Sequence, residues 1–317
     1  MSDLDAHPAI TEARPAAGEG AVLELYESRQ VPLGGVRGMR VDRLLPHRSL
    51  PTVGAWCFLD RFGPQRTDMR VLPHPHTGLQ TVTWPLRGRI RHRDSLGNDV
   101  LLRPGQLNLM TAGHGVSHSE FSVGEAPLLD ALQLWLALPA DRAAGEAGFE
   151  QHVELPVYED GGLRATVFAG GIGGTVSPAT VYTPLAGADL ELAAGTATSV
   201  PLRRDFEYGL LVLSGELEVA GSRLAAGPLL YLGTGRDEVA VSAAAEARAV
   251  LLGGEPFPDD LVMWWNFVGR DHEEIAAARA GWEDGDRFGT VPGHGGERIP
   301  APALPGVRLR PRSRRSR

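Results

Sequence analysis

Two short motifs constrain this chain more than any other feature: His74-Pro75-His76 and His118-Ser119-Glu120. Side chains of an extended strand alternate between its two faces, so each motif projects two side chains to the same side of a strand. If the two strands are neighbours, three imidazoles and one carboxylate meet at one point. Such a donor set suits a divalent first-row metal such as iron, copper, nickel or manganese. The alternative is a set of polar side chains satisfied at a barrel end, although burying them without partners is costly.

Short β-prone runs, separated by turn residues, surround both motifs. Between about Ala21 and Leu138 such runs recur roughly every ten residues, a spacing typical of an all-β sandwich or barrel. The segments Asp94–Asp99 and Arg103–Gly105 have the composition of turns between them. We therefore predict an all-β fold for this part of the chain.

A second β-rich stretch repeats the pattern of the first. Leu213-Ser-Gly-Glu216 resembles Leu86-Arg-Gly-Arg89, and Leu224-Ala-Ala-Gly-Pro228 resembles Leu102-Arg-Pro-Gly105. This similarity indicates two copies of one fold. Where the first copy has its histidine pair, the second has Asp205-Phe-Glu207, so we expect the second copy to be structural and without metal.

The chain divides by composition into five segments. Asp271 is predicted to cap a helix, with Glu274 three residues on and Gly281 as its end. The predicted segments are a disordered leader (1–20), a first β domain with the metal site (21–138), a linker (139–155), a second, degenerate β domain ending in the helix (156–282), and a tail with an arginine-rich end (283–317).

Charge and cysteine content exclude several classes of function. The formal net charge is −8, which argues against direct nucleic-acid binding. We find no secretory signal and no apolar run of membrane-spanning length. The single cysteine, Cys57, lies in an apolar run and is predicted to be a buried structural thiol. A chain that forms no internal disulfide is expected in a reducing cytoplasm.

Several segments together resemble the pirin family of bicupin metalloproteins, over about residues 36–282. The resemblance is carried by Phe58–Pro64, Val71–Val82, His92–Gly97, Asn108–Glu120 and Met263–Arg270. It implies two tandem cupin barrels or sandwiches, with one iron-type centre in the N-terminal barrel. On the matching positions the metal ligands are His74, His76, His118 and Glu120.

Three further polar residues are candidates for outer contacts around the metal. Gln80 stands where cupins often have a glutamate ligand, and an amide is more suited to hydrogen bonding a ligand or a substrate. His114 is either such an outer residue or a turn residue, and the direction in which His92 faces is open. The cofactor is expected to be one divalent metal, foremost Fe²⁺, with copper, nickel, manganese and zinc as alternatives.

The family resemblance implies two functions of different classes. One is a quercetin 2,3-dioxygenase-like activity on a flavonol and dioxygen, in which Glu120 accepts the proton of the substrate hydroxyl. The other is a metal-dependent regulator that binds a transcription factor or a metabolic enzyme. An enzyme needs an apolar pocket that opens onto the metal, whereas a regulator does not. Trp84, Leu107, Leu109 and Met110 are candidate pocket walls, although a role in the core is the simpler expectation. A purely structural metal site is less consistent with these ligands, because structural sites are closed and rich in cysteine.

Overall fold

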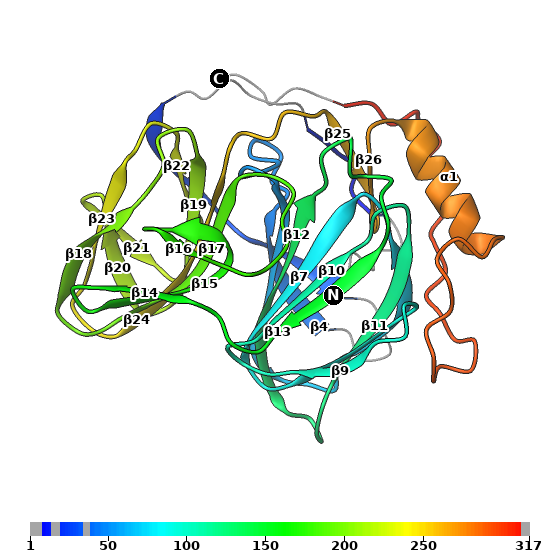
Figure 1. Ribbon diagram of the computed structural model, residues 1–317, viewed down its shortest axis with the longest axis horizontal. Coiled ribbons are helices and arrows are strands. Elements are labelled where there is room, and N and C mark those ends of the chain that lie inside the picture. Colours follow the sequence, from blue (N-terminus) through cyan, green and yellow to red (C-terminus); the bar gives the residue numbers. More distant parts are fainter. Residues whose placement is uncertain (1–7, 14–19, 34–38, 312–317) are drawn as a thin grey trace.

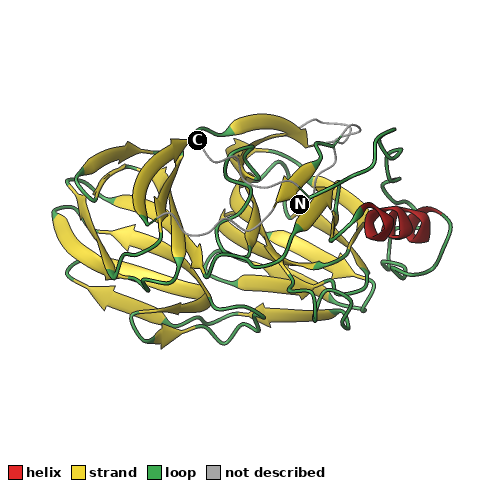
Figure 2. Cartoon of the chain, turned by 90° about the horizontal axis from the view of Figure 1, so that it is seen from above, coloured by secondary structure: helices red, strands yellow, loops and turns green. Residues whose placement is uncertain are grey.

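The computed structural model describes residues 8–13, 20–33 and 39–311, and it contains two β-sandwich barrels side by side (Figure 1). Each barrel pairs a wide sheet with a four-stranded sheet, as the all-β prediction requires. Figure 2 shows the two barrels from above, with the single described helix at the outer end of one of them. The prediction of a bicupin with a C-terminal helix is confirmed. The described chain contains no helix that is both long and apolar enough to cross a membrane.

The N-terminal barrel carries both sequence motifs. Its four-stranded sheet runs in the order β6 (Arg70–His76), β11 (Val116–Ser122), β8 (Ile90–Asp94) and β9 (Asp99–Leu102). The facing sheet has, in spatial order, β13 (Gly148–His152), β10 (Leu107–Thr111), β7 (Leu79–Arg87), β12 (Leu128–Ala137), β5 (Trp56–Arg66), β4 (Met39–Leu45) and β3 (Arg29–Leu33).

The C-terminal barrel repeats this arrangement. Its smaller sheet has the order β18 (Thr196–Pro201), β23 (Glu238–Ala243), β20 (Glu216–Val219) and β21 (Ser222–Ala225). Its larger sheet has the order β14 (Val157–Asp160), β15 (Leu163–Ile172), β17 (Leu185–Leu192), β24 (Ala247–Gly254), β19 (Glu207–Ser214), β22 (Leu229–Gly233) and β2 (Ala21–Tyr26), and β16 (Thr175–Val176) pairs with β15.

Segments near both ends of the chain cross between the barrels. β2, in the segment assigned above to the first domain, forms an edge of the C-terminal barrel. In the other direction, β25 (Leu261–Trp264) and β26 (Phe267–Gly269) join β1 (Thr11–Ala13) in a small sheet beside the N-terminal barrel. The predicted linker contains β13, which pairs with β10. Most of the predicted leader lies outside the described residues, as does the end of the tail. The strand pairing thus ties the two barrels together at both ends.

Helix α1 (His272–Glu283) packs on this small sheet, on the side of the N-terminal barrel (Figure 1). Asp271 caps it as predicted, because its carboxylate accepts a hydrogen bond from the backbone N–H of Glu274. The prediction that Gly281 ends the helix was wrong. The helix continues for two residues and buries Trp282, whose indole donates to the carbonyl of Ile299. Tertiary packing therefore outweighs the low helix propensity of glycine here.

One hydrophobic core runs through the contact between the barrels. Trp56 and Trp84 of the first barrel both pack against the ring of Phe168 in the second. The Trp56 indole donates to the carbonyls of Ala186 and Gly253, and the Trp84 indole donates to Asp189. These buried contacts make the two barrels one packed unit.

The carboxylate of Glu207 joins the barrels at the position where the second copy lacks its histidines. It accepts hydrogen bonds at 2.6 Å from the backbone N–H of Gly54 and at 2.6 Å from the hydroxyl of Tyr231. We expect Glu207→Ala to lower the free energy of unfolding by about 1–3 kcal/mol for each buried donor it leaves unpaired. Urea unfolding measures this loss. Glu207→Gln, which can still accept from Gly54 and donate to Tyr231, should retain most of the stability. An alanine variant as stable as the parent would contradict the proposed tie.

Candidate metal centre

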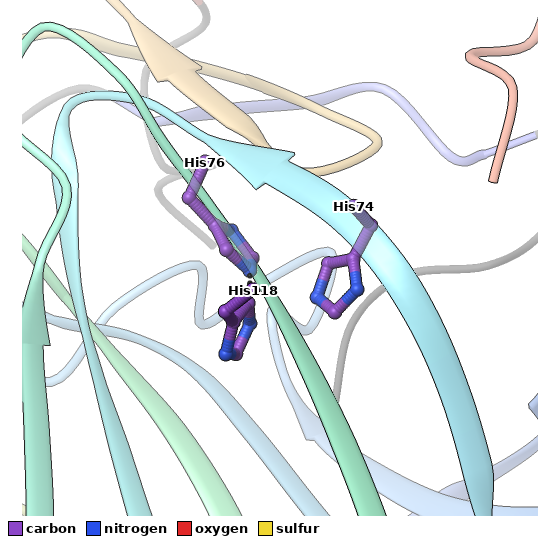
Figure 3. Close-up of side chains that lie close together, drawn as sticks. All are labelled: His74, His76 and His118. Carbon is purple, nitrogen blue, oxygen red and sulfur yellow. Dashed lines mark hydrogen bonds between the residues drawn. The ribbon is translucent and has the colours of Figure 1, made fainter. Parts of the chain in front are cut away.

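The two motifs lie on adjacent antiparallel strands whose register brings their side chains together. On β6 and β11, His118 is paired with His74, and Val116 with His76. Strand alternation sends the intervening residues outward, where the Ser117 hydroxyl donates to the carbonyl of Phe288. Figure 3 shows His74 and His76 projecting from β6 toward His118 of β11. All four residues proposed as ligands, His74, His76, His118 and Glu120, are fully buried.

The donor atoms fall into two overlapping groups that share His118. Those of His74, His76 and His118 lie within 4.8 Å of one another, and so do those of His92, His118 and Glu120. The Nε2 atoms of His76 and His118 are 3.1 Å apart. Two nitrogens bound at about 2.1 Å to one ion, at right angles, would be separated by about 3 Å. The residues present therefore fit a divalent metal.

Backbone carbonyls fix the orientation of two of the imidazoles. The Nδ1 atom of His74 is 2.8 Å from the carbonyl oxygen of Leu72, and that of His76 is 3.2 Å from the carbonyl oxygen of Asn266. A carbonyl oxygen can only accept, so both Nδ1 atoms carry the proton. Their Nε2 atoms then keep a lone pair for a metal, an arrangement usual for histidine ligands.

Burial keeps the imidazoles neutral. It lowers the pKa of His74 from 6.5 to about 3, and it holds the pKa of His76 and His118 well below 6.5. A neutral imidazole is the form that binds a metal. The cluster is thus ready to bind a metal ion at neutral pH without first losing protons.

The carboxylate of Glu120 is held by the facing sheet. The Thr83 hydroxyl, on β7, donates to Glu120 Oε1 at 2.8 Å, and it lies 3.2 Å from the amide oxygen of Gln133 on β12. Trp135, also on β12, packs edge-on against His76 with ring centroids 5.3 Å apart. Trp135 also stacks on Phe58, with ring centroids 4.0 Å apart. An apolar wall therefore stands beside the polar cluster.

The three residues proposed for outer contacts lie in different places. His92 is buried, with Nδ1 3.4 Å from Nδ1 of His118. Gln80 instead donates to the Thr111 hydroxyl and to the carbonyl of Thr180, between β16 and β17 of the C-terminal barrel, both at 2.9 Å. His114 is exposed, with Nδ1 3.1 Å from the carbonyl oxygen of Gly145. Of the three, His92 is brought to the cluster, whereas none of the described hydrogen bonds of Gln80 or His114 reaches a proposed ligand.

Asp94 lies beside His92 and also belongs to the buried polar region. Its Oδ2 atom is 3.1 Å from His92 Nε2, and its carboxylate accepts from the side chain and backbone N–H of Asn98. Burial alone would raise the pKa of Asp94, but the hydrogen bonds from His92 and Asn98 lower it below the usual value. Asp94 is therefore an ionised, buried acceptor.

Sequence reasoning missed Thr83, Asp94 and the carbonyl of Asn266 as members of the site. The sequence did not indicate a role for Thr83, because the composition of its strand is that of a buried core strand. Asp94 was read as part of a turn, which it also is. Asn266 lies in the segment Met263–Arg270 that carries the family resemblance, and this was the available sign that the segment matters. The proposed pocket walls Trp84, Leu107, Leu109 and Met110 all lie in the main hydrophobic core.

Two family models match the chain: Pirin over residues 38–136, and Pirin C-terminal cupin domain over residues 187–289. The chain is 45% identical over 289 residues to a Pseudomonas aeruginosa protein named "Putative quercetin 2,3-dioxygenase", covering 90% of this chain and 91% of that one. It is 35% identical to a pirin-like protein of Caulobacter vibrioides, over 82% of this chain and 93% of the relative.

Solved structures agree with the sequence comparisons. A crystal structure of quercetin 2,3-dioxygenase from Acinetobacter baumannii superimposes with a TM-score of 0.86 at 41% identity, covering 90% of this chain and 96% of that one. The residues matched by the Pirin model, 38–136, contain both motifs. The chain therefore belongs to the pirin family.

Proposed function

We propose that this protein is an iron-dependent dioxygenase that opens the ring of a flavonol such as quercetin. The observation that carries the proposal is the buried group of His74, His76 and His118 in the N-terminal barrel, with Glu120 grouped beside His118. The similarity to proteins named as quercetin 2,3-dioxygenases supports the substrate class. Copper, nickel, manganese and zinc suit the same donors, so Fe²⁺ is the choice that the experiment below tests.

Each residue has a defined role in this proposal. His74, His76 and His118 would hold the ion through Nε2, and Glu120 would supply the single carboxylate. A bound divalent metal supplies acidity to the 3-hydroxyl of the flavonol and a centre for dioxygen chemistry. Glu120 accepts the hydroxyl proton, while the Thr83 hydroxyl holds its Oε1 atom in place. Trp135 and Phe58 exclude water from the side of His76.

The single cysteine and the net charge of the chain agree with this proposal. The single cysteine, Cys57, is buried, and burial raises its thiol pKa to about 12, so it is inert. We place the protein in the cytoplasm, where such a thiol stays reduced. The proposed substrate is a small aromatic molecule. Because the net charge of the chain is −8, we propose no direct contact with nucleic acid.

The test is turnover by the protein reconstituted with ferrous iron under anaerobic conditions. On addition of quercetin and air, we expect loss of flavonol absorbance together with release of carbon monoxide. The His118→Ala variant, treated in the same way, should show neither. Absence of turnover by a fully metallated protein would refute the dioxygenase proposal.

Complete burial of the ligands favours a second candidate, a regulator whose metal does not meet a substrate. The carbonyl of Asn266 accepts from His76, and the backbone N–H of Val268 donates to the carbonyl of Thr77. These bonds connect the metal cluster to the small sheet on which α1 packs. A change in the oxidation state of the metal would then alter the surface around α1 and the affinity for a protein partner. Iron-dependent binding of a transcription factor or a metabolic enzyme, lost in the His76→Ala variant, would support this candidate.

A further inference from the structure

We propose that His92 and Asp94 form a hydrogen-bonded relay that fixes the tautomer and orientation of His118, making both of them positioning residues for the metal centre. The inference rests on the proposed metal site. It concerns His118. In the described contacts, the Nδ1 atoms of His74 and His76 lie beside backbone carbonyls, whereas the Nδ1 of His118 lies beside the side chain of His92.

Strand register sets up the relay. β8 lies beside β11, with Asp94 paired to His118 and His92 paired to Glu120. His92 and Asp94 are two residues apart and so project from the same face of β8, toward the ligands. Both are buried, His92 with 1% of its surface exposed and Asp94 with none.

The direction of the hydrogen bonds follows from the chemistry of the partners. An ionised carboxylate only accepts, so the Nε2 of His92, 3.1 Å from Asp94 Oδ2, carries a proton. In the proposed relay, the Nδ1 of His118 donates to the Nδ1 of His92, 3.4 Å away. The Nε2 of His118, which faces Nε2 of His76 at 3.1 Å, then keeps its lone pair for a metal.

Packing holds the relay rigid at both ends. The His92 ring stacks on Phe149 of β13, with centroids 4.6 Å apart and planes 23° from parallel. The Oδ1 atom of Asp94 accepts from the backbone N–H groups of Leu96 and Asn98, which closes the turn after β8. Phe149 and Asp94 thus hold the His92 ring in one orientation. Loss of such an outer partner typically weakens metal affinity by about 10–100-fold.

The experiment uses the whole protein, labelled with ¹⁵N-histidine and loaded with Zn²⁺ as a diamagnetic probe. Long-range ¹H–¹⁵N spectra report the tautomer of each ring. We expect His74, His76 and His118 to be protonated at Nδ1 and bound to zinc through Nε2. His92 should show the opposite pattern, with its proton on Nε2 and no zinc bound. A zinc-shifted His92 nitrogen would make it a ligand and overturn the relay.

Two variants measure what the relay contributes to zinc affinity. His92→Phe keeps a ring to stack on Phe149, and Asp94→Asn keeps an oxygen for the turn but places an amide N–H against His92. Both should bind one zinc per chain with a Kd raised about 10–100-fold, and Asp94→Asn should move the His92 proton to Nδ1. Asp99→Asn is the matched control, since Asp99 pairs with Arg91 and Arg93 on the exposed side of the sheet.

The outcomes separate the relay from the site that it serves. Unchanged zinc affinity in His92→Phe and Asp94→Asn, with affinity lost in His118→Ala, would overturn the relay and leave the metal site standing. Failure of the parent protein to bind zinc at all would overturn both. Loss of affinity in Asp99→Asn equal to that in Asp94→Asn would assign the effect to net charge and so also refute the relay.

Discussion

His76→Ala and His118→Ala should each lose most of the bound metal while the barrel stays folded. Each change removes one of three imidazoles from a four-residue donor set, so the loss in affinity should exceed the roughly 10–100-fold typical of outer partners. The measurement is metal content after dialysis, together with a zinc titration. Circular dichroism of the same samples tests whether the β-structure persists.

The control for this prediction, His114, lies in the turn just before β11. His114 is exposed and hydrogen bonded near Gly145, so His114→Ala removes an imidazole without touching the cluster. It should bind metal like the parent. Asp205→Asn, in the second barrel, should also leave the metal content unchanged, because the carboxylate of Asp205 is exposed and pairs with Arg203. Full occupancy in both His76→Ala and His118→Ala would refute the ligand assignment.

The four proposed ligands could be selected from the sequence because the pattern that pairs them is local. An alternation of period two puts His74 beside His76 and His118 beside Glu120 on one strand face, whatever the rest of the chain does. The two strands then need only be neighbours, which the structure shows. Repetition of turn and strand patterns likewise carried the prediction of two barrels, since each turn depends on a few adjacent residues.

The rest of the site depends on contacts between distant segments. The direction of His92 is set by the register of β8 on β11 and by the ring of Phe149, which the sequence separates widely. The partner of His76 is the backbone carbonyl of Asn266. Every residue has a backbone carbonyl, so the residue type does not point to this contact. Thr83 reads as one more β-branched residue of a buried strand. The exchange of segments between the barrels could not be predicted from the sequence either, because an edge strand can pair with either sheet.

Metal-free protein should lose stability as the pH falls from 7 to 5. The folded-state pKa of His74 is about 3, against 6.5 as the ordinary value, so the unfolded chain takes up a proton below pH 6.5 that the folded chain refuses. Stability is therefore fully present above about pH 6.5 and falls with pH down to the folded pKa. At pH 5, about 1.5 pH units below the ordinary histidine pKa, the expected loss of stability from His74 alone is about 2 kcal/mol.

Burial of His76 and His118 acts in the same direction, so the cluster as a whole should produce a steeper loss than His74 alone. Urea unfolding of metal-stripped protein at several values between pH 7 and pH 5 measures the slope, in a range above the titration of ordinary carboxyl groups. His74→Asn, which removes one of the three contributions, should show a shallower slope. Zinc-loaded protein should resist the change until the ion dissociates, since bound metal holds the imidazoles unprotonated.

A slope that is flat in the metal-free parent would mean that the imidazoles accept protons within the fold. The neutral, lone-pair-bearing cluster on which the metal centre depends would then not exist in the absence of the ion.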